Sequence, residues 1–389
     1  MLHITTALQA FIGTTFADGH IFYRNVVHMS RGKVSNLKKV CIIASSLNIM
    51  GGQAVQAADL KTRFENEGIS VGFLAINPQL PGIFRVFQQI KYIRTLVTWP
   101  LYVASLLFTV PRFDVLHLFS ASYSSFLLAP APAAFIGKLF RKRVVLNYHS
   151  GEAEDHLNRS LPTIQRVLRF VDCVVVPSEY LRRVFEKFGI TTTVVPNIVD
   201  FEAFLFKQRL IFRPRFLVAR TLEPLYNVGC VLRAFRLIQN RFPDASLTLV
   251  GSGSQELALK ELAVTLGLQH VRFVGRVERA SIPLYYAEHD IMLNASNIDN
   301  MPLSILESFA SGVPVVSTMA GGIPYLIKDG ETGMLVHLDD HQALAKRAMD
   351  LLDNQALARD IAQLAHDECL RKYSWSVIRD QWLNTYGMG

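Results

Sequence analysis

The strongest constraint in this sequence is an alternation of short, continuously apolar runs with helix-like stretches. Runs such as 38–46, 69–76, 113–119 and 143–148 are rich in Val, Ile, Leu and Phe, with little alternation between polar and apolar residues. Strands of this kind are buried on both faces, as in a parallel sheet covered by helices on each side. The pattern therefore predicts an α/β fold with helical crossovers between parallel strands.

The same pattern begins again after residues 197–212, with apolar runs at 215–219, 246–250, 271–275, 290–294, 313–317 and 333–336. A chain of 389 residues is also longer than one hydrophobic core usually supports. We therefore expect two doubly wound, Rossmann-like domains facing each other across a cleft. Their expected bounds are 37–205 and 206–372, with an extension at 1–36 outside the core and a C-terminal helix at 373–389 that can pack back on the first domain.

The stretch 297–317, "NIDNMPLSILESFASGVPVVS", predicts a short helix over about 302–311. Pro302 suits the first helical position, and Gly312 suits the position after the last turn. One face carries Ser304, Glu307, Ser308 and Ser311, at helical spacing. The free N–H groups at a helix start favour binding of phosphate. A carboxylate one turn further along can accept hydrogen bonds from a vicinal diol such as that of ribose. A ligand with both groups would be a nucleotide. A partly exposed amphipathic helix is equally compatible with the pattern.

Other candidate positions follow predicted strands. Gly51 and Gly52 would allow close approach of a ligand to the backbone, although a tight turn is the simpler explanation. The segment 249–256, "LVGSGSQE", contains Gly251 but only part of a dinucleotide-binding motif. His149 stands at the carboxyl end of a strand, where open α/β sheets bind ligands, whereas His117 is expected to be a packed strand residue. The sequence contains no HExxH, Walker A or GxSxG motif and no metal-spaced His/Cys cluster.

Charge is distributed unevenly along the chain. Residues 1–200 carry 21 Lys and Arg against 12 Asp and Glu, a net charge of +9, whereas residues 201–389 carry −1. The basic half is expected to meet an anionic partner, either a membrane surface or a phosphorylated substrate. Nucleic acid is not expected, because the basic residues are not interleaved with aromatic motifs.

Two further features bear on location. The uncharged run 95–110 is too short to span a bilayer and is expected to form either a buried helix pair or an apolar patch on a membrane surface. The N-terminus does not read as a secretory signal, and the four cysteines are widely spaced and form no CxxC pair. A cytoplasmic protein, peripheral on the inner face of the membrane, is the expectation.

In their order and spacing, several motifs resemble the retaining glycosyltransferases of family four, which have a GT-B fold. The resemblance extends from about residue 38 to the C-terminus. It is carried by "MGGQA", "DVLHL", "NYHSG", "VPSEYLRRVFEKFG", "VVPNIVD", "VARTLEPLYNV", "LVGSGSQE", "VRFVGRV", the stretch 297–327 and "DGETGMLV".

The resemblance implies roles for individual residues. Its two-acid E-x7-E motif falls on Asp299 and Glu307, with Asp299 near the donor sugar and Glu307 on the ribose. His149 matches the active-site histidine, so that these three residues are the candidate catalytic set. The remaining implied nucleotide-sugar contacts are Gly51, Gly52, Arg220, Asn227, Gly251, Arg276, Val277, Leu303 and Ser304. A lysine that relatives place on the diphosphate is missing, and "LEPLYNV" has Tyr226–Asn227 there.

The implied reaction is transfer of a sugar from a UDP- or GDP-sugar to an acceptor hydroxyl, with retention and without a metal ion or other cofactor. The implied acceptor is a glycan or a lipid-linked intermediate, and an anionic membrane surface is a candidate partner. Three alternatives remain open from the sequence: an NAD-dependent Rossmann oxidoreductase, a non-catalytic sugar-nucleotide-binding protein, and another GT-B enzyme such as a nucleotide-sugar epimerase.

Overall fold

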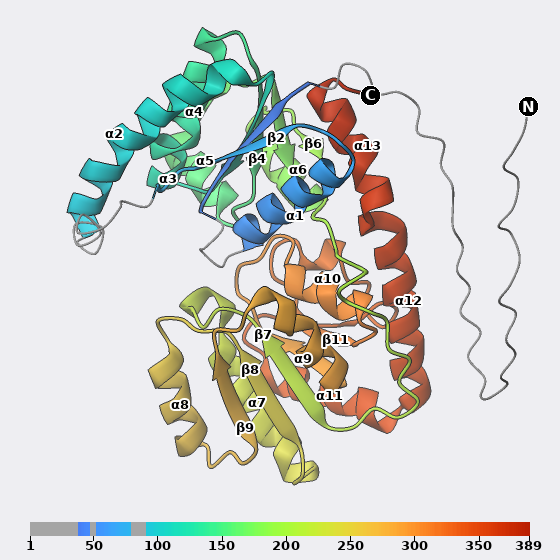
Figure 1. Cartoon of the computed structure of the whole chain (residues 1–389). Coiled ribbons are helices and arrows are strands. Elements are labelled where there is room, and N and C mark those ends of the chain that lie inside the picture. The colour runs from blue at the N-terminus through green and yellow to red at the C-terminus, as the bar shows by residue number, and fades with distance from the viewer. Residues whose placement is uncertain (1–37, 47–51, 79–90) are drawn as a thin grey trace, which may run out of the picture. The chain divides into compact units, whose positions relative to one another are not determined.

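The computed structural model describes residues 38–46, 52–78 and 91–389, which form two lobes, each built on a six-stranded sheet (Figure 1). Every strand pair in both sheets is parallel. The predicted fold class, two doubly wound Rossmann-like domains, is therefore confirmed. The predicted N-terminal extension at 1–36 lies outside the described residues.

The N-terminal lobe has the strand order β2-β1-β3-β4-β5-β6. Its strands are β1 Val40–Ala44, β2 Val71–Ala75, β3 Val115–Ser120, β4 Arg143–Tyr148, β5 Cys173–Val176 and β6 Thr193–Val194. Its helices are α1 Gly52–Asn66, α2 Lys91–Thr109, α3 Ser124–Leu128, α4 Pro130–Leu139, α5 Ala153–Leu168 and α6 Glu179–Glu186. Strands β1, β3 and β4 are almost entirely buried, as expected for continuous apolar runs.

The C-terminal lobe has the order β12-β11-β10-β7-β8-β9. Its strands are β7 Arg215–Ala219, β8 Ser246–Val250, β9 Val271–Gly275, β10 Ile291–Asn294, β11 Val315–Thr318 and β12 Met334–Val336. Its helices are α7 Val228–Arg241, α8 Glu256–Thr265, α9 Ile282–Glu288, α10 Leu303–Ala310 and α11 His341–Asp353. The observed bounds of β7, β8 and β9 are those predicted.

The last two helices, α12 (Gln355–Tyr373) and α13 (Trp375–Tyr386), connect the lobes. Helix α12 packs on α10 of the C-terminal lobe, and α13 packs on β4 of the N-terminal lobe. The Tyr386 hydroxyl lies 2.6 Å from His117 Nδ1, and the Arg143 side chain donates to the Thr385 carbonyl at 2.9 Å. His117 is fully buried, so its prediction as a packed strand residue is confirmed.

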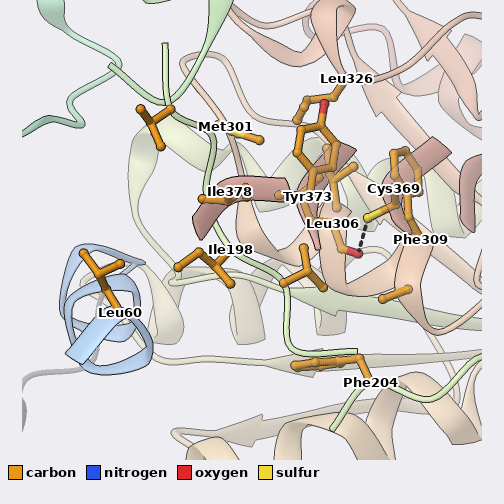
Figure 2. Close-up of a cluster of buried hydrophobic side chains, with 14 of the residues drawn as sticks. Leu60, Ile198, Phe204, Met301, Leu306, Phe309, Leu326, Cys369, Tyr373 and Ile378 are labelled. Atoms are coloured by element: carbon orange, nitrogen blue, oxygen red, sulfur yellow. Dashed lines mark hydrogen bonds between the residues drawn. The ribbon is translucent and has the colours of Figure 1, made fainter. Parts of the chain in front are cut away.

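One apolar core continues from lobe to lobe (Figure 2). It combines Leu60 of α1, Ile198 and Phe204 of the connecting segment, and Leu306 of α10 with residues of α12 and α13. Cys369 of α12 donates a weak hydrogen bond to the Leu306 carbonyl at 3.7 Å. The helix that carries Glu307 is therefore anchored on its far side by this core.

The expected helix pair at 95–110 is wrong. Residues 91–109 form the single helix α2, which continues through Pro100. Proline removes one backbone hydrogen bond and frees the carbonyl four residues earlier, at Leu96. Leu96 is 74% exposed, so water can solvate that carbonyl and the helix need not break.

A buried arginine joins the connecting segment to the C-terminal lobe. The Arg209 guanidinium donates to the carbonyls of Tyr286, His289, Ser311 and Gly312 at 2.6–3.1 Å, and it lies 3.4 Å from the buried carboxylate of Asp290. Burial lowers the pKa of Arg209 to about 10, which leaves it charged at neutral pH.

We expect Arg209→Met to lower the free energy of unfolding by about 3–5 kcal/mol, because it leaves buried acceptors without their donor. Chemical denaturation followed by circular dichroism measures this. The control is Arg241→Met, which removes an exposed pair with Asp353 and should cost under about 1 kcal/mol. Equal losses in the two variants would contradict this assignment.

Candidate functional site

A cavity of about 760 Å³ lies between the carboxyl ends of the two sheets. The N-terminal lobe contributes Gly52 and His149 to its wall. The C-terminal lobe contributes the predicted residues Arg220, Gly251, Arg276, Val277, Asp299, Leu303, Ser304 and Glu307. Two predicted residues are not placed there: Gly51 lies outside the described residues, and Asn227 does not line the cavity. The Asn227 amide instead donates to Asp339 at 3.0 Å.

Gly251 shapes the floor of the cavity. Its φ is 141°, and a Cβ at this position would lie 1.9 Å from the Arg220 carbonyl oxygen. Only glycine fits so close an approach, which brings the ends of β7 and β8 together. This segment follows the second strand of its lobe and packs on the backbone at Arg220, so its role here is close packing of two strand ends.

Glu307 is the buried acid of the cavity. It lies on α10 and is 6% exposed. Arg279 donates to its Oε1, and the Tyr286 hydroxyl lies 3.1 Å from Oε2 and 3.0 Å from the Ser304 carbonyl. These partners hold the carboxylate in one orientation, with lone pairs still available for further donors.

The helix that carries Glu307 differs from the expectation in two ways. Pro302 is the N-cap, with ψ of 122°, and the helix begins at Leu303. The polar face is also not solvated, because Ser304, Glu307, Ser308 and Ser311 are all buried. Ser308 donates to the Val313 carbonyl at 2.8 Å, whereas the Ser304 hydroxyl is buried with no partner among the described residues. The alternative of a partly exposed amphipathic helix is therefore wrong.

Arg279 also reaches the N-terminal lobe. Its Nη2 lies 3.7 Å from Asp59 Oδ2 on α1. Asp59 stands close to the Arg63–Asp200 pair, which is separated by 3.2 Å. Burial raises the pKa of Asp59 to about 6, and Arg279 opposes that shift. The carboxylates of Asp59 and Glu307 thus share one guanidinium across the seam between the lobes.

Arg220 and Asp299 form a second buried pair in the cavity wall. Asp299 Oδ2 accepts from Arg220, and Oδ1 accepts from the Asn300 backbone at 3.0 Å, so both oxygens are used within the protein. The Arg220 guanidinium lies 3.9 Å from the centroid of Tyr226, which occupies the region of the expected lysine. Arg220 Nε is buried without a partner in the described part of the chain. This nitrogen and the Ser304 hydroxyl are donors that an anion at the start of α10 would satisfy.

His149 follows β4 directly. Its backbone N–H donates to the Ser120 carbonyl at 3.1 Å, and its ring stacks on Phe119 with centroids 5.2 Å apart. Desolvation lowers the pKa of His149 to about 3, so the ring is neutral at physiological pH. In this environment His149 can exchange hydrogen bonds with a ligand but does not supply a positive charge.

A second cavity of about 710 Å³ adjoins the first and shares Gly151, Glu152 and Ile298 with it. Its wall includes the carboxylates of Glu152, Glu154 and Asp155 and the rings of Tyr123 and Tyr180. A molecule bound there would therefore approach the first cavity close to His149.

Three of these residues were not predicted from the sequence: Arg279, Asp59 and Tyr286. No motif marks them, because Arg279 and Tyr286 meet Glu307 through packing within the C-terminal lobe, and Asp59 approaches Arg279 from the other lobe. Over the described ranges, no cluster of three or more His, Cys, Asp or Glu side chains has a metal-binding arrangement, and no helix has the length and apolar character needed to span a membrane.

Two facing parallel sheets, with a helix start and a buried acid lining the cavity at their junction, have the architecture of the GT-B class of glycosyltransferase. The family described as "Glycosyltransferase Family 4" matches residues 50–203, and "Glycosyl transferases group 1" matches residues 203–367. The chain belongs to the family-four glycosyltransferases. This family membership agrees with the predicted resemblance and leaves no support for an oxidoreductase.

Individual relatives agree with this family assignment. A phosphatidyl-myo-inositol mannosyltransferase of Mycobacterium leprae is 28% identical over 286 residues, which cover 70% of this chain and 73% of the relative. A GDP-mannose-dependent mannosyltransferase of Mycolicibacterium smegmatis, acting on phosphatidylinositol monomannoside, is 29% identical over 58% of this chain and 65% of its own length.

Solved structures show the same fold. Anabaena HepE in complex with UDP and glucose superposes with a TM-score of 0.72 at 20% identity, over 90% of this chain and 99% of its own. A sucrose-phosphate synthase from Thermosynechococcus elongatus gives 0.74 at 18% identity, over 90% and 98%. The fold of the whole described region is therefore that of GT-B enzymes.

The raised pKa of Asp59 predicts a pH-dependent cost to stability. Its folded pKa of about 6 lies above the ordinary aspartate value of about 4, so stability falls as pH rises from about 4 to 6, and the penalty is complete above that range. We expect Asp59→Asn to raise the free energy of unfolding at pH 7.5 by about 1–3 kcal/mol and to leave it unchanged at pH 4.

Denaturant titrations at the two pH values measure this effect. Glu65→Gln, which removes an exposed pair with Lys61 on the same helix, serves as the control and should stay within about 0.5 kcal/mol. An Asp59→Asn variant that is less stable than the wild type at pH 7.5 would refute the prediction.

Proposed function

We propose that the protein transfers a sugar from a nucleoside-diphosphate sugar to an acceptor hydroxyl with retention of anomeric configuration. The observation that carries this proposal is the arrangement around α10. Glu307 is held in a fixed orientation one turn after the helix start, and donors without partners, Ser304 Oγ and Arg220 Nε, stand beside it. The diphosphate would bind to the N–H groups at the helix start and to these donors, and the ribose diol would hydrogen-bond to Glu307.

The donor is proposed to be a UDP- or GDP-sugar. UDP is bound by HepE, and GDP-mannose is used by the M. smegmatis relative. Arg276, Val277 and Gly251 line the same cavity as Glu307, and we propose that the base lies against Arg276 and Val277. The proposal needs no metal ion, because Arg220 and the dipole of α10 would stabilise the negative charge of the leaving diphosphate.

In the proposed step, the bond between the anomeric carbon and the diphosphate oxygen breaks, and a bond from that carbon to the acceptor oxygen forms on the same face. The acceptor proton passes to the departing diphosphate, so no protein nucleophile is required. Neutral His149 would hydrogen-bond to the donor sugar beside the reacting carbon. Asp299, whose oxygens are already used, would act by holding Arg220 in place.

The acceptor would enter through the second cavity, whose carboxylates and tyrosines suit the hydroxyl groups and apolar faces of a glycan. A lipid-linked glycan or glycolipid is the proposed acceptor class. The named acceptors of the mycobacterial relatives, phosphatidyl-myo-inositol and phosphatidylinositol monomannoside, are consistent with this class.

An exposed apolar surface on the N-terminal lobe supports a membrane-bound acceptor. Helix α2 packs against α4 (Figure 1), and the two helices expose Leu96, Phe108, Phe135 and Leu139, each more than half exposed. The loop that follows α4 carries the exposed Arg141, and Arg112 is exposed at the end of the 3-10 turn Val110–Arg112 that follows α2. Apolar side chains bordered by basic residues suit an anionic bilayer surface. We therefore propose peripheral attachment at the inner face of the membrane.

Nucleotide binding tests the donor site. Glu307→Ala should weaken UDP or GDP, whichever the wild type binds, by roughly 10–100-fold in isothermal titration, because hydrogen bonds from the ribose to a carboxylate are lost. The variant should also lose the preference of the wild type for that nucleotide over its 2′,3′-dideoxy analogue.

The matched control for this measurement is Glu278→Ala, which removes an exposed acid that does not line the cavity. Its affinity should equal that of the wild type. If Glu307→Ala kept the preference for ribose, the proposed role of Glu307 would be wrong.

Vesicle flotation tests the membrane surface. The protein should float with vesicles rich in anionic lipid at low salt, and the double variant Leu96→Ser, Phe108→Ser should bind at least about tenfold more weakly, because two large apolar side chains no longer enter the bilayer. The control replaces Leu257 and Val264 by serine, two equally exposed apolar residues on α8 of the other lobe. Wild-type protein that fails to float at low salt would count against attachment.

A further inference from the structure

The side chain of Arg220 is held between an aromatic ring and a carboxylate in the wall of the larger cavity. The guanidinium carbon lies 3.9 Å from the ring centroid of Tyr226, and Asp299 accepts a hydrogen bond from Nη2. The side chains of Arg220 and Asp299 are each 11% exposed. A ring face and a carboxylate together restrict both the plane and the direction of a guanidinium. These contacts therefore restrict Arg220 to one orientation.

The local structure of the chain fixes Tyr226. Residues Pro224–Tyr226 form a 3-10 turn, which ends at Asn227 with a φ of 43°. Asparagine tolerates this left-handed conformation better than most residues, and the Asn227 amide anchors the turn by donating to Asp339 at 3.0 Å. The side chain of Tyr226 packs on the apolar core of the C-terminal lobe. A ring supported by that core is a stable surface for the guanidinium.

The backbone of Arg220 is constrained as well. Its N–H donates to the Val250 carbonyl at 3.0 Å, one residue beyond the end of β7. Its carbonyl oxygen is the atom that Gly251 approaches so closely that a Cβ would lie 1.9 Å away. The base and the tip of the Arg220 side chain are thus both held by contacts within the protein.

One N–H of this constrained guanidinium is unused. Arg220 Nε is buried without a hydrogen-bond partner among the described residues, as is the Ser304 hydroxyl on α10. Both residues line the cavity, and Asp299, which pairs with Arg220, stands four positions before Leu303, where α10 begins. A buried donor without a partner is costly, so a ligand oxygen that accepts from it would bind favourably. An oxygen of a diphosphate at the start of α10 fits this requirement.

The orientation of Arg220 matters because of the cations that surround the cavity. The described residues that line it include three arginines, Arg220, Arg276 and Arg279, but no lysine. Arg279 is committed to Glu307 and lies 3.7 Å from Asp59. A planar guanidinium binds phosphate through paired, directional hydrogen bonds, whereas an ammonium acts as a point charge. An arginine that tilts away would therefore lose much of its contribution to diphosphate binding.

We propose that Tyr226 is a positioning residue for the diphosphate. Its ring face, together with the carboxylate of Asp299, keeps the Arg220 guanidinium directed at the diphosphate oxygens. Tyr226 acts through Arg220 and makes no contact of its own with the ligand, and its hydroxyl is not required. This inference rests on the proposed function, because the diphosphate is that of the proposed sugar donor. The same positioning would stabilise the negative charge that develops on the leaving diphosphate.

Isothermal titration with a ligand series tests the positioning role. Tyr226→Leu should weaken UDP or GDP, whichever the wild type binds, by roughly 3–30-fold, because the guanidinium is no longer stacked. The corresponding nucleoside, which has no phosphate, should bind the variant as it binds the wild type. Tyr226→Phe keeps the ring face and should bind the diphosphate like the wild type. Equal losses for diphosphate and nucleoside would overturn the proposal.

A double-mutant cycle shows whether Tyr226 acts through Arg220. In an Arg220→Gln background, Tyr226→Leu should have no further effect on diphosphate affinity, because no guanidinium remains to be oriented. The same loss in both backgrounds would mean that the ring touches the ligand directly, which would overturn the proposal. The matched control is Tyr285→Leu, which removes a ring 5.8 Å from the Arg272 guanidinium outside the cavity and should leave the affinity unchanged. Circular dichroism confirms that each variant is folded.

NMR of the full chain with ¹⁵N-labelled arginine examines the contact without any nucleotide. The Nε–H signal of Arg220 is assigned by its absence in Arg220→Gln. In the wild type it should be shifted upfield by the ring current of Tyr226, a shift that Tyr226→Phe keeps and Tyr226→Leu removes. An Arg220 signal that does not respond to Tyr226→Leu would contradict the positioning contact even if the nucleotide bound. If the protein bound neither UDP nor GDP, the proposed function would fail, whereas the NMR result would still decide whether Tyr226 orients Arg220.

Discussion

The site depends on keeping a charged carboxylate inside the protein. Glu307 is almost fully buried, and an acid there is costly unless other groups compensate its charge. Arg279 and the Tyr286 hydroxyl supply that compensation, and Arg279 also reaches Asp59 on the opposite lobe. Glu307, the acid that is proposed to bind ribose, is therefore held by Arg279, which also lies close to a carboxylate of the other lobe. A change in the distance between the lobes would therefore alter the charge environment of Glu307.

The missing phosphate-binding lysine has a structural counterpart. Tyr226 stands in that region and packs against the guanidinium of Arg220, while Asp299 fixes the other side of the same group. An aromatic face and a carboxylate together hold Arg220 close to the start of α10. In this chain Arg220 alone thus stands where relatives are expected to use two cations. Asp299, the first acid of the two-acid motif, holds that arginine in place.

Much of the fold could be predicted because buried parallel strands leave a direct mark in sequence. Strands β7, β8 and β9 have the predicted bounds, since their apolar runs end at polar or glycine residues. Helix α2 was mispredicted because a proline weakens a helix without always ending it, and here the helix continues through Pro100 with the residue of the freed carbonyl, Leu96, largely exposed. Within the site, residues in motifs were found, such as Ser304 and Glu307. Arg279, Asp59 and Tyr286 were not, because their proximity arises from the meeting of α1, α9 and α10, which no local pattern encodes.

The central claim is that the cavity between the lobes binds a nucleoside diphosphate through α10 and Glu307. A crystal structure of the protein with UDP or GDP tests this most directly. We expect the diphosphate at the start of α10, within hydrogen-bond distance of Ser304 and Arg220, and both ribose hydroxyls on the carboxylate of Glu307. A nucleotide bound elsewhere, or one whose ribose makes no contact with Glu307, would contradict the account.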